Sequence, residues 1–158
     1  MNTANHDIKL SESLKKKYIA LSLKGASKKE VLTELVELVA ESNKLKDKKE
    51  FLKVVLERER LGSTGIGNGV AIPHAKSNVV KSFILAFGRA ERGIDFGALD
   101  GEKTYLFFIL ASPREEVGRH LKVMSKISRL ISDKFIVESL KRAKTSDEIL
   151  KIISLQDK

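Results

Sequence analysis

The sequence predicts an α/β domain with helices on both faces of a β-sheet. Apolar segments of strand length alternate with amphipathic segments of helical spacing along the whole chain. One of the strand segments, residues 105–111, is a continuous apolar run, which is typical of a strand covered on both faces. The length of 158 residues suits a single domain, residues 1–158, in which we expect residues 1–12 to be frayed or flexible.

The first half of the chain predicts one strand and two helices. Residues 18–23 alternate apolar with small or polar side chains, as a strand does. Ser27 and Glu30 form a capping box before apolar residues at helical spacing, so a helix is expected to about residue 42. Asp47 is placed to cap a second helix, which ends near residue 60.

A glycine-rich segment then leads into three more strands. Residues 62–69 contain four glycines, which predicts an irregular loop with accessible backbone N–H groups. Residues 70–72 predict a short strand that Pro73 stops. Two buried strands are expected at residues 83–87 and 105–111, separated by a turn-like segment at 93–101 with Ile94 and Phe96 as anchors.

The last third of the chain predicts helices. Ser112 precedes Pro and Glu in the pattern of an N-cap, so a long amphipathic helix begins either near Ser112 or near Val117, because Gly118 weakens the first turn. A short helix is expected at residues 135–140, and Ser146 opens a final helix that ends near residue 155.

Composition excludes several classes of protein. The chain has no cysteine, which excludes disulfide scaffolds, thiolate metal sites and cysteine nucleophiles. No apolar run approaches the ~18 residues that cross a bilayer, and the N-terminus lacks the apolar core of a signal peptide. We therefore expect a cytoplasmic protein without membrane insertion. The net charge of +9 comes from scattered lysines interleaved with acidic residues, which favours a solvated surface over a nucleic-acid site.

Two of the three histidines are candidate site residues. His74 directly follows a predicted strand, and His120 lies near the start of the long helix after another strand. Ligands in α/β sheets bind at the carboxyl ends of strands, so the two side chains meet if their strands are neighbours. His6 lies in the N-terminal segment and is given no role. Position alone favours a structural hydrogen-bonding role for such a histidine.

The neighbourhood of His74 favours chemistry. Backbone N–H groups of Gly65, Gly67 and Gly69 and the hydroxyls of Ser63 and Thr64 are suited to hold an anion. Arg58, at the end of the preceding helix, offers a fork-shaped cation that matches phosphate oxygens. A neutral histidine near pH 7 has a free nitrogen lone pair and is a competent nucleophile.

Other chemistries fit less well. Two histidines without a clustered carboxylate fall short of the three or four ligands of a zinc site. The sequence has no G-x-S-x-G nucleophile elbow. Its glycine-rich segment lacks the G-K-[ST] ending of a P-loop and the spacing of G-x-G-x-x-G.

Arg58-Glu59 followed by G-S-T-G-I-G-N-G-V-A-I-P-H at residues 62–74 resembles the signature of the enzyme IIA domains of the bacterial phosphoenolpyruvate-dependent sugar phosphotransferase system, of the fructose, mannitol and nitrogen-regulatory type. The likeness extends to the opening strand and helix, to I-D-F-G-A-L-D-G at 94–101 and to the long helix with His120. It implies a three-layer α/β sandwich with a mixed sheet.

The resemblance also implies a function. His74 takes a phosphoryl group from phospho-HPr or a related carrier and passes it to a IIB component, while His120 and Arg58 stand beside the phosphohistidine. Neither a metal nor another cofactor is expected, because protein groups supply the donors. Transfer needs a transient complex, so we expect apolar residues around His74. Two alternatives stay open, namely a regulator that acts on a target protein through its phosphorylation state and a non-catalytic nucleic-acid or ligand-binding module.

Overall fold

A mixed six-stranded β-sheet forms the middle layer of the fold. The structure, a computed structural model, describes residues 8–157. The strands are β1 (Leu14–Ala20), β2 (Gly65–Gly67), β3 (Val70–Ala71), β4 (His74–Lys76), β5 (Ile84–Ile94) and β6 (Thr104–Ser112). Their order is β1-β5-β6-β3-β2, and β4 also pairs with β6.

The sheet is mixed because its central strand has neighbours of both directions. β5 runs antiparallel to β6, whereas β3 and β4 run parallel to β6 along its other edge. β1 is parallel to β5, and β2 is antiparallel to β3. The short strands β3 and β4 therefore follow one another along the same side of β6, separated only by Ile72 and Pro73.

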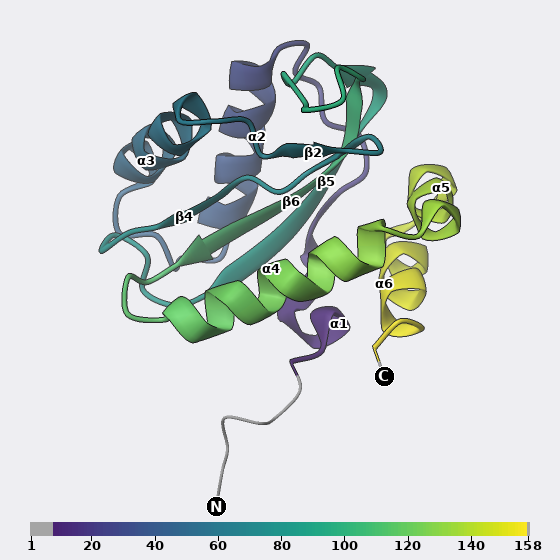
Figure 1. The fold of residues 1–158 in the computed structure, drawn as a ribbon. Helices are drawn as coiled ribbons and strands as arrows, with labels where there is room; N and C mark the ends of the chain where they lie inside the picture. Colours follow the sequence, from purple (N-terminus) through teal and green to yellow (C-terminus); the bar gives the residue numbers. More distant parts are fainter. Residues whose placement is uncertain (1–7, 158) are drawn as a thin grey trace, which may run out of the picture.

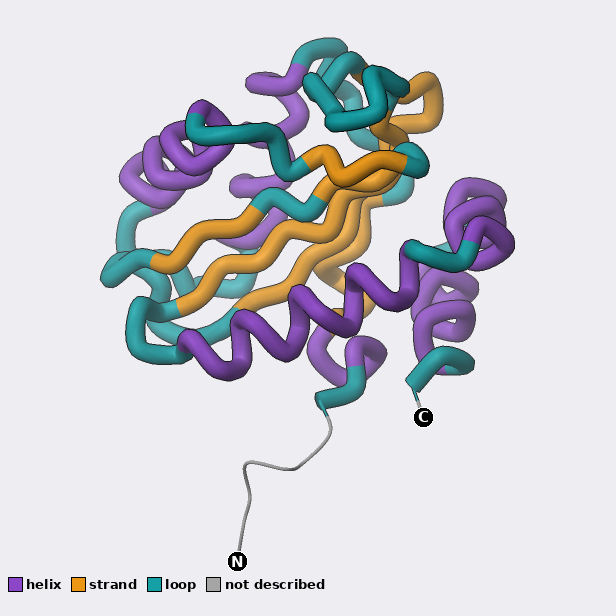
Figure 2. Tube along the Cα trace, viewed as in Figure 1, coloured by secondary structure: helices purple, strands orange, loops and turns teal. Residues whose placement is uncertain are grey.

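Helices form the two outer layers, as Figure 1 and Figure 2 show. One face of the sheet is covered by α2 (Lys28–Ala40) and α3 (Lys48–Arg60). The other face carries α1 (Leu10–Ser13), α4 (Val117–Ile131), α5 (Lys134–Arg142) and α6 (Ser146–Ser154). The predicted three-layer α/β sandwich with a mixed sheet is thus confirmed.

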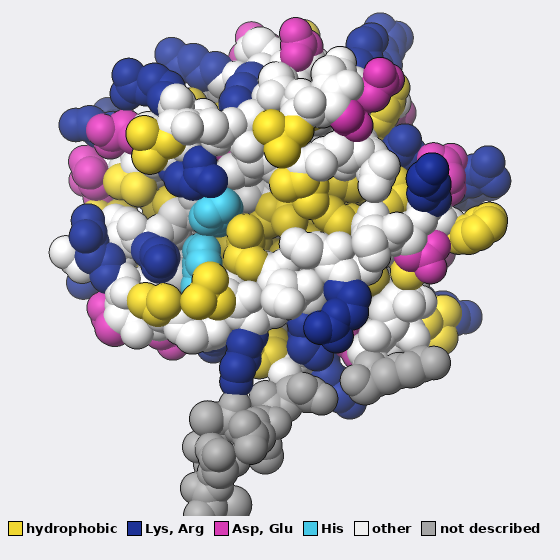
Figure 3. Space-filling view, viewed as in Figure 1, with side chains coloured by type: hydrophobic (Ala, Val, Ile, Leu, Met, Phe, Trp, Pro, Cys, Tyr) yellow, Lys and Arg dark blue, Asp and Glu magenta, His cyan; other side chains and the backbone are white. Residues whose placement is uncertain are grey.

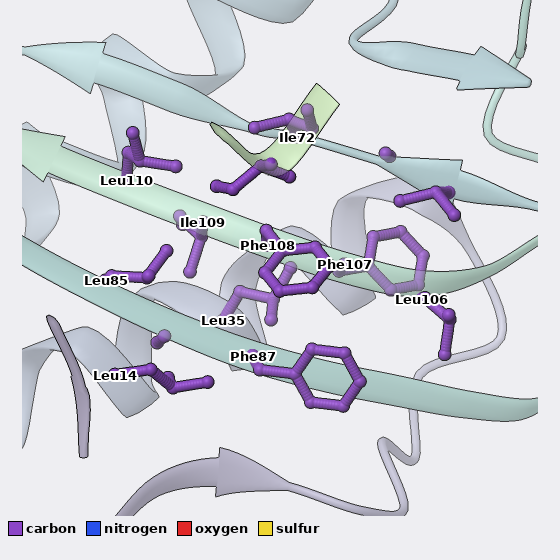
Figure 4. Packing of buried hydrophobic residues seen from close by; sticks show 14 of the residues in the cluster. Leu14, Leu35, Ile72, Leu85, Phe87, Leu106, Phe107, Phe108, Ile109 and Leu110 are labelled. Carbon is purple, nitrogen blue, oxygen red and sulfur yellow. The ribbon is translucent and has the colours of Figure 1, made fainter. Parts of the chain in front are cut away.

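The core lies on both sides of β5 and β6 (Figure 4). Of the apolar run predicted at residues 105–111, every side chain from Leu106 to Ala111 is fully buried, whereas Tyr105 is half-buried. Phe87 of β5 and Phe108 of β6 meet edge to face, with ring centroids 5.1 Å apart. Each fully buried side chain of this size contributes about 1.5–3 kcal/mol to folding, so the two strands form a rigid support for the segments at their ends.

The N-terminal elements differ from the prediction. β1 begins at Leu14 and not at residue 18, and α1 precedes it, so residues 10–12 belong to a helix. Leu10 is buried, and the backbone N–H groups of Leu10 and Ser11 donate to the Asp157 carboxylate. This contact joins opposite ends of the sequence, which no local pattern reveals. The rest of the predicted frayed segment, residues 1–7 with His6, lies outside the described residues.

Most of the predicted helix starts are confirmed. The side chains of Ser27 and Asp47 accept hydrogen bonds from the backbone N–H groups of Glu30 and Glu50, at the first turns of α2 and α3. The last helix begins at Ser146 as predicted, capped by Thr145. The long helix α4 begins at Val117, the later of the two predicted starts, and this boundary fixes the position of His120.

Candidate functional site

His74, His120 and Arg58 line one surface cavity of about 840 Å³. Arg58 comes from the last turn of α3, His74 from the first residue of β4 and His120 from the first turn of α4, so all three layers of the fold contribute. In Figure 3 the two histidines, in cyan, lie together on the surface among cationic and apolar side chains. The expected meeting of these residues is confirmed.

Backbone geometry orients His74. The chain leaves β3 at Ala71, passes Pro73 and pairs again with β6 at His74, which lies opposite Leu110. Nδ1 of His74 is 2.7 Å from the backbone oxygen of Ile72. A carbonyl oxygen only accepts hydrogen bonds, so Nδ1 carries a proton and, in the neutral ring, Nε2 holds the free lone pair.

The His74 ring is held in its neutral form. Burial lowers the pKa of His74 because it penalises the charged ring, and the nearby cations Arg58 and Lys76 lower it further. The hydrogen bond to Ile72 and the Glu59 carboxylate act in the opposite direction without reversing the shift. At neutral pH, Nε2 is therefore an unprotonated nitrogen in an electropositive cavity.

His120 is fixed by a buried serine. Its Nδ1 lies 2.8 Å from the hydroxyl of Ser112, the last residue of β6. Ser112 was predicted as a possible helix N-cap, but its side chain is fully buried and holds His120 instead. The rings of His74 and His120 meet edge to face with centroids 5.3 Å apart. Burial, helped by His74 and Lys76, lowers the pKa of His120 to about 4.

We expect the stability of the protein to fall on acidification because of this shift. The pKa of His120 is about 4 in the folded chain and 6.5 in the unfolded chain, so between these values the unfolded chain binds more protons. The free energy of unfolding therefore decreases as the pH falls from 6.5 to 4, by up to about 3 kcal/mol. Urea denaturation across this window measures it, and His120→Gln should remove the part of the slope that His120 contributes, while the lowered pKa of His74 leaves a smaller slope of the same sign.

The position of Arg58 is set by the end of α3. Its Nη1 donates to the backbone oxygen of Gly62 at 2.9 Å, which ties the guanidinium to the start of the glycine-rich segment. Arg58 also lines the cavity with His74, and its charge acts on the His74 ring. A cation at this place favours negative charge near Nε2.

The two hydroxyls predicted to bind phosphate are occupied elsewhere. Ser63 donates to the backbone oxygen of Phe96 at 3.0 Å, and the buried hydroxyl of Thr64 donates to the Glu59 carboxylate. Neither residue is among those that line the cavity with His74. The local sequence suggested that these hydroxyls bind an anion. In the structure they donate instead to the Phe96 oxygen and to the Glu59 carboxylate.

Gly65, Gly67 and Gly69 also lie away from the cavity. They build the β2–β3 hairpin, in which Gly67 and Gly69 have φ of 106° and 80°, a region that favours glycine. The hairpin packs on the 95–101 segment, where the backbone N–H of Leu99 donates to the oxygen of Gly65. None of the five predicted phosphate-binding residues is among the residues that line this cavity, and their phosphate-binding role stays a prediction.

Glu59, which follows Arg58 in the signature, is buried and was not predicted as a site residue. Its carboxylate lies 2.8 Å from Nζ of Lys28 and accepts from the backbone N–H of Thr64 at 3.2 Å. Lys28 in turn donates to the backbone oxygen of Phe96. Glu59 of α3 therefore holds Lys28 of α2 and the backbone at Thr64, and through Lys28 it is connected to the backbone at Phe96. The sequence feature that could have indicated this role is the position of a glutamate next to Arg58 at the end of a helix.

Removal of the Glu59 charge should destabilise the protein far more than removal of an exposed acid. Glu59→Gln leaves Lys28 without its ionic partner, at a cost of about 3 kcal/mol, because the side chain of Glu59 is only 4% exposed. The matched control is Glu37→Gln, which breaks the ion pair with Lys48 where the Glu37 side chain is 55% exposed and should cost less than about 1 kcal/mol. Urea denaturation compares the two; equal losses would contradict a special role of Glu59.

Two further structural findings concern residues 8–157. None of the helices in this range is both long and apolar enough to cross a membrane. The same range holds no group of three or more histidine, cysteine, aspartate or glutamate side chains placed to bind a metal ion.

Comparison with known proteins finds related sequences over nearly the whole chain. The family model described as "Phosphoenolpyruvate-dependent sugar phosphotransferase system, EIIA 2" matches residues 12–156. A fructose-specific EIIABC component from Bacillus subtilis is 36% identical over 96% of this chain, which spans 24% of that protein. A nitrogen regulatory protein from Bradyrhizobium diazoefficiens is 37% identical, over 85% of this chain and 87% of that protein.

Solved structures show the same fold. The nitrogen regulatory protein IIA-Ntr from Neisseria meningitidis superimposes with a TM-score of 0.86 and 36% identity, over 91% of this chain and 98% of that one. The IIA mannitol protein of Escherichia coli shares the fold at a TM-score of 0.76 and 24% identity, over 87% of this chain and 96% of that one. The family match covers nearly the whole chain and includes His74, His120 and Arg58. The chain therefore belongs to the EIIA 2 family of the phosphoenolpyruvate-dependent sugar phosphotransferase system.

Proposed function

We propose that the protein is a phosphoryl carrier that accepts a phosphoryl group on Nε2 of His74 from phospho-HPr or a related phosphocarrier. The observation that carries this proposal is the hydrogen bond of 2.7 Å from Nδ1 of His74 to the Ile72 oxygen. It leaves Nε2 as the free nucleophile, and the lowered pKa keeps that nitrogen unprotonated. Membership of the EIIA 2 family supports the same reaction class.

Phosphoryl transfer forms one nitrogen–phosphorus bond and breaks another. The lone pair on Nε2 of His74 forms the new nitrogen–phosphorus bond while the bond between phosphorus and the donor nitrogen of the carrier breaks. The electron pair of that bond returns to the carrier. Nδ1 of His74 keeps its proton throughout, and the Ile72 oxygen stabilises the positive charge that develops on the phosphorylated ring.

His120 and Arg58 stabilise the charge of the transferred group in this proposal. When the Ser112 hydroxyl donates to Nδ1 of His120, the proton of the neutral ring is on Nε2, which can donate to a phosphoryl oxygen. Arg58 supplies a cation that lines the same cavity and acts on His74. Three equatorial oxygens carry the negative charge in the transition state, so donors fixed in advance lower the barrier.

Apolar residues around the histidines give a partner a place to dock. The exposed fractions of Leu61, Val117 and Leu121 are 86%, 44% and 60%. Leu61 and Leu121 line the cavity itself. Exposed apolar side chains at a cavity are typical of a protein contact. We expect a transient complex that buries less than about 1,200 Å².

The phosphoryl group has two candidate destinations. The relatives include a fructose-specific EIIABC component and a nitrogen regulatory protein at nearly equal identity, 36% and 37%. In the first case His74 passes the group to a IIB component for sugar uptake. In the second case the phosphorylated and free forms differ in their binding to a target protein.

One experiment tests the carrier function and separates the two destinations. The chain is incubated with phosphoenolpyruvate, enzyme I and HPr, and the labelled residue is mapped by mass spectrometry at neutral pH. We expect a single phosphohistidine at His74, and absence of labelling would refute the carrier function. Addition of a fructose-type IIB domain then discharges His74 if sugar uptake is the destination and leaves it phosphorylated if the role is regulatory.

Arg58→Ala should slow phosphorylation of His74 by on the order of 10²-fold, as expected for the loss of one charge-stabilising donor. Arg58→Lys keeps the charge but loses the bidentate hydrogen-bonding geometry of the guanidinium, so it should recover only part of the rate. Rapid-quench phosphotransfer measures both variants. A wild-type rate in Arg58→Ala would show that Arg58 does not assist the transfer and that its role is limited to the hydrogen bond with the Gly62 oxygen.

A further inference from the structure

Lys76 lies on the same face of β4 as His74. Alternate residues of a strand have their side chains on the same face, and only the buried Ala75 separates Lys76 from His74 in this strand. Lys76 is exposed, and it lines the same cavity as His74. The strand therefore brings the nucleophile and a cation together in one cavity.

The register of the sheet places Lys76 beside the residue that holds His120. β4 pairs with β6 in the parallel direction, and Lys76 lies opposite Ser112. Residues that lie opposite one another in paired strands have their side chains on the same face of the sheet. The Ser112 hydroxyl is 2.8 Å from Nδ1 of His120. Lys76, Ser112 and His120 are thus neighbours on one side of the sheet.

The charge of Lys76 acts on both histidine rings. It lowers the pKa of His74 and the pKa of His120, because a nearby cation penalises a second positive charge. The centroids of the two rings are 5.3 Å apart. A cation that opposes positive charge on both rings also favours a negatively charged group that binds at them.

The ammonium group of Lys76 is available for such a group. It forms no ion pair with another side chain within residues 8–157. The guanidinium of Arg58, by contrast, already donates to the Gly62 oxygen. Nζ of a lysine has three N–H donors on a flexible four-carbon stem. Lys76 can therefore turn toward an incoming anion without the loss of an ion pair.

We propose that Nζ of Lys76 donates to an oxygen of the phosphoryl group on His74, so that Lys76 is a further phosphoryl-binding residue. The inference rests on the proposed function and adds a residue to its site. Negative charge is spread over three phosphoryl oxygens, and Lys76 supplies a third donor besides His120 and Arg58. The proton of the ammonium stays on Nζ, so the bonds that form and break are those of the transfer step itself. Lys76 stabilises both the transition state and the phosphorylated protein.

The test includes a phosphoryl donor that needs no protein interface. Phosphoramidate transfers its phosphoryl group to a histidine nitrogen and releases ammonia, so its rate reports on the site alone. Lys76→Gln should slow phosphorylation of His74 from phosphoramidate and from phospho-HPr by a similar factor, about tenfold or more, as expected for the loss of a hydrogen bond to a charged group. Lys76→Arg keeps a cation and should recover most of the rate. Mass spectrometry confirms that the label is on His74.

A second measurement follows the phosphoryl group directly. A cation at its oxygens favours the dianion, so the pKa of the phosphoryl group on His74, measured by phosphorus NMR, should be higher in Lys76→Gln than in the wild type. The matched control is Lys81→Gln, which removes an exposed lysine in the loop after β4, outside the cavity. It should leave both rates within about twofold of wild type and the phosphoryl pKa unchanged. Circular dichroism confirms that all variants are folded.

Three results would overturn the role of Lys76. Slow transfer from phospho-HPr with a wild-type rate from phosphoramidate would assign Lys76 to contact with the partner protein. Equal effects of Lys76→Gln and Lys81→Gln would reduce the effect to net charge. An unchanged phosphoryl pKa in Lys76→Gln would show that Nζ does not reach the phosphoryl oxygens. Failure of phospho-HPr to label the wild-type chain would refute the carrier function, whereas the phosphoramidate rates and the phosphoryl pKa test Lys76 separately.

Discussion

His74→Gln should abolish phosphorylation of the protein by phosphoenolpyruvate and the upstream carriers, a loss of several orders of magnitude. Glutamine has nearly the volume of histidine but no nitrogen lone pair that forms a bond to phosphorus. His120 should not replace it, because the Ser112 hydroxyl occupies Nδ1 of His120 and the proton of the neutral ring is then on Nε2. Mass spectrometry of the intact protein after incubation measures the loss.

The control for this prediction is the other histidine of the cavity. His120→Gln should still be labelled on His74, since Nε2 of His74 and its hydrogen bond to the Ile72 oxygen are unchanged. Both variants should unfold at similar urea concentrations near pH 7.5, where the two histidines are neutral in the folded and the unfolded chain. Label on another residue of His74→Gln would show that His74 is not the acceptor.

The fold was predictable wherever a local pattern determines structure. Ser27 and Asp47 cap their helices because a side-chain oxygen next to free N–H groups needs no distant partner. The run at residues 105–111 reveals a strand buried on both faces. The N-terminal end was not predictable, because α1 depends on Asp157, and Lys15 to Lys17 obscure a strand whose buried residues are Leu14 and Tyr18.

The grouping of His74, His120 and Arg58 was predictable because their strand and helix ends converge at one edge of the sheet. The role of the glycine-rich segment in phosphate binding stays a prediction. Its N–H groups and hydroxyls suggested an anion site, but Phe96 and Glu59 take the hydroxyls of Ser63 and Thr64. The sequence shows that hydroxyl donors are present, but it does not show which buried acceptor each of them binds. The tautomer of His74 was equally hidden, since it depends on the position of the Ile72 oxygen.

His120→Ala should leave His74 able to accept a phosphoryl group but slow its transfer by on the order of 10²-fold, the cost of one lost donor to a transition-state oxygen. The substitution removes the only described histidine that faces His74, with ring centroids 5.3 Å apart. Phosphorylated protein should therefore accumulate when the acceptor is present. Single-turnover transfer from purified phosphoprotein measures the rate.

Two further variants separate a donor role of His120 from a packing role. The amide of glutamine can donate from nearly the place of Nε2, so His120→Gln should transfer faster than His120→Ala. Ser112→Ala keeps the ring but removes the hydroxyl 2.8 Å from Nδ1, which frees the tautomer and should slow transfer by about tenfold. If His120 serves only to fill the buried space between β6 and α4, stability should follow the lost volume while the transfer rates of all three variants stay at the wild-type value. A graded loss of transfer in folded variants therefore identifies the hydrogen bond from His120 as the feature that moves the phosphoryl group onward.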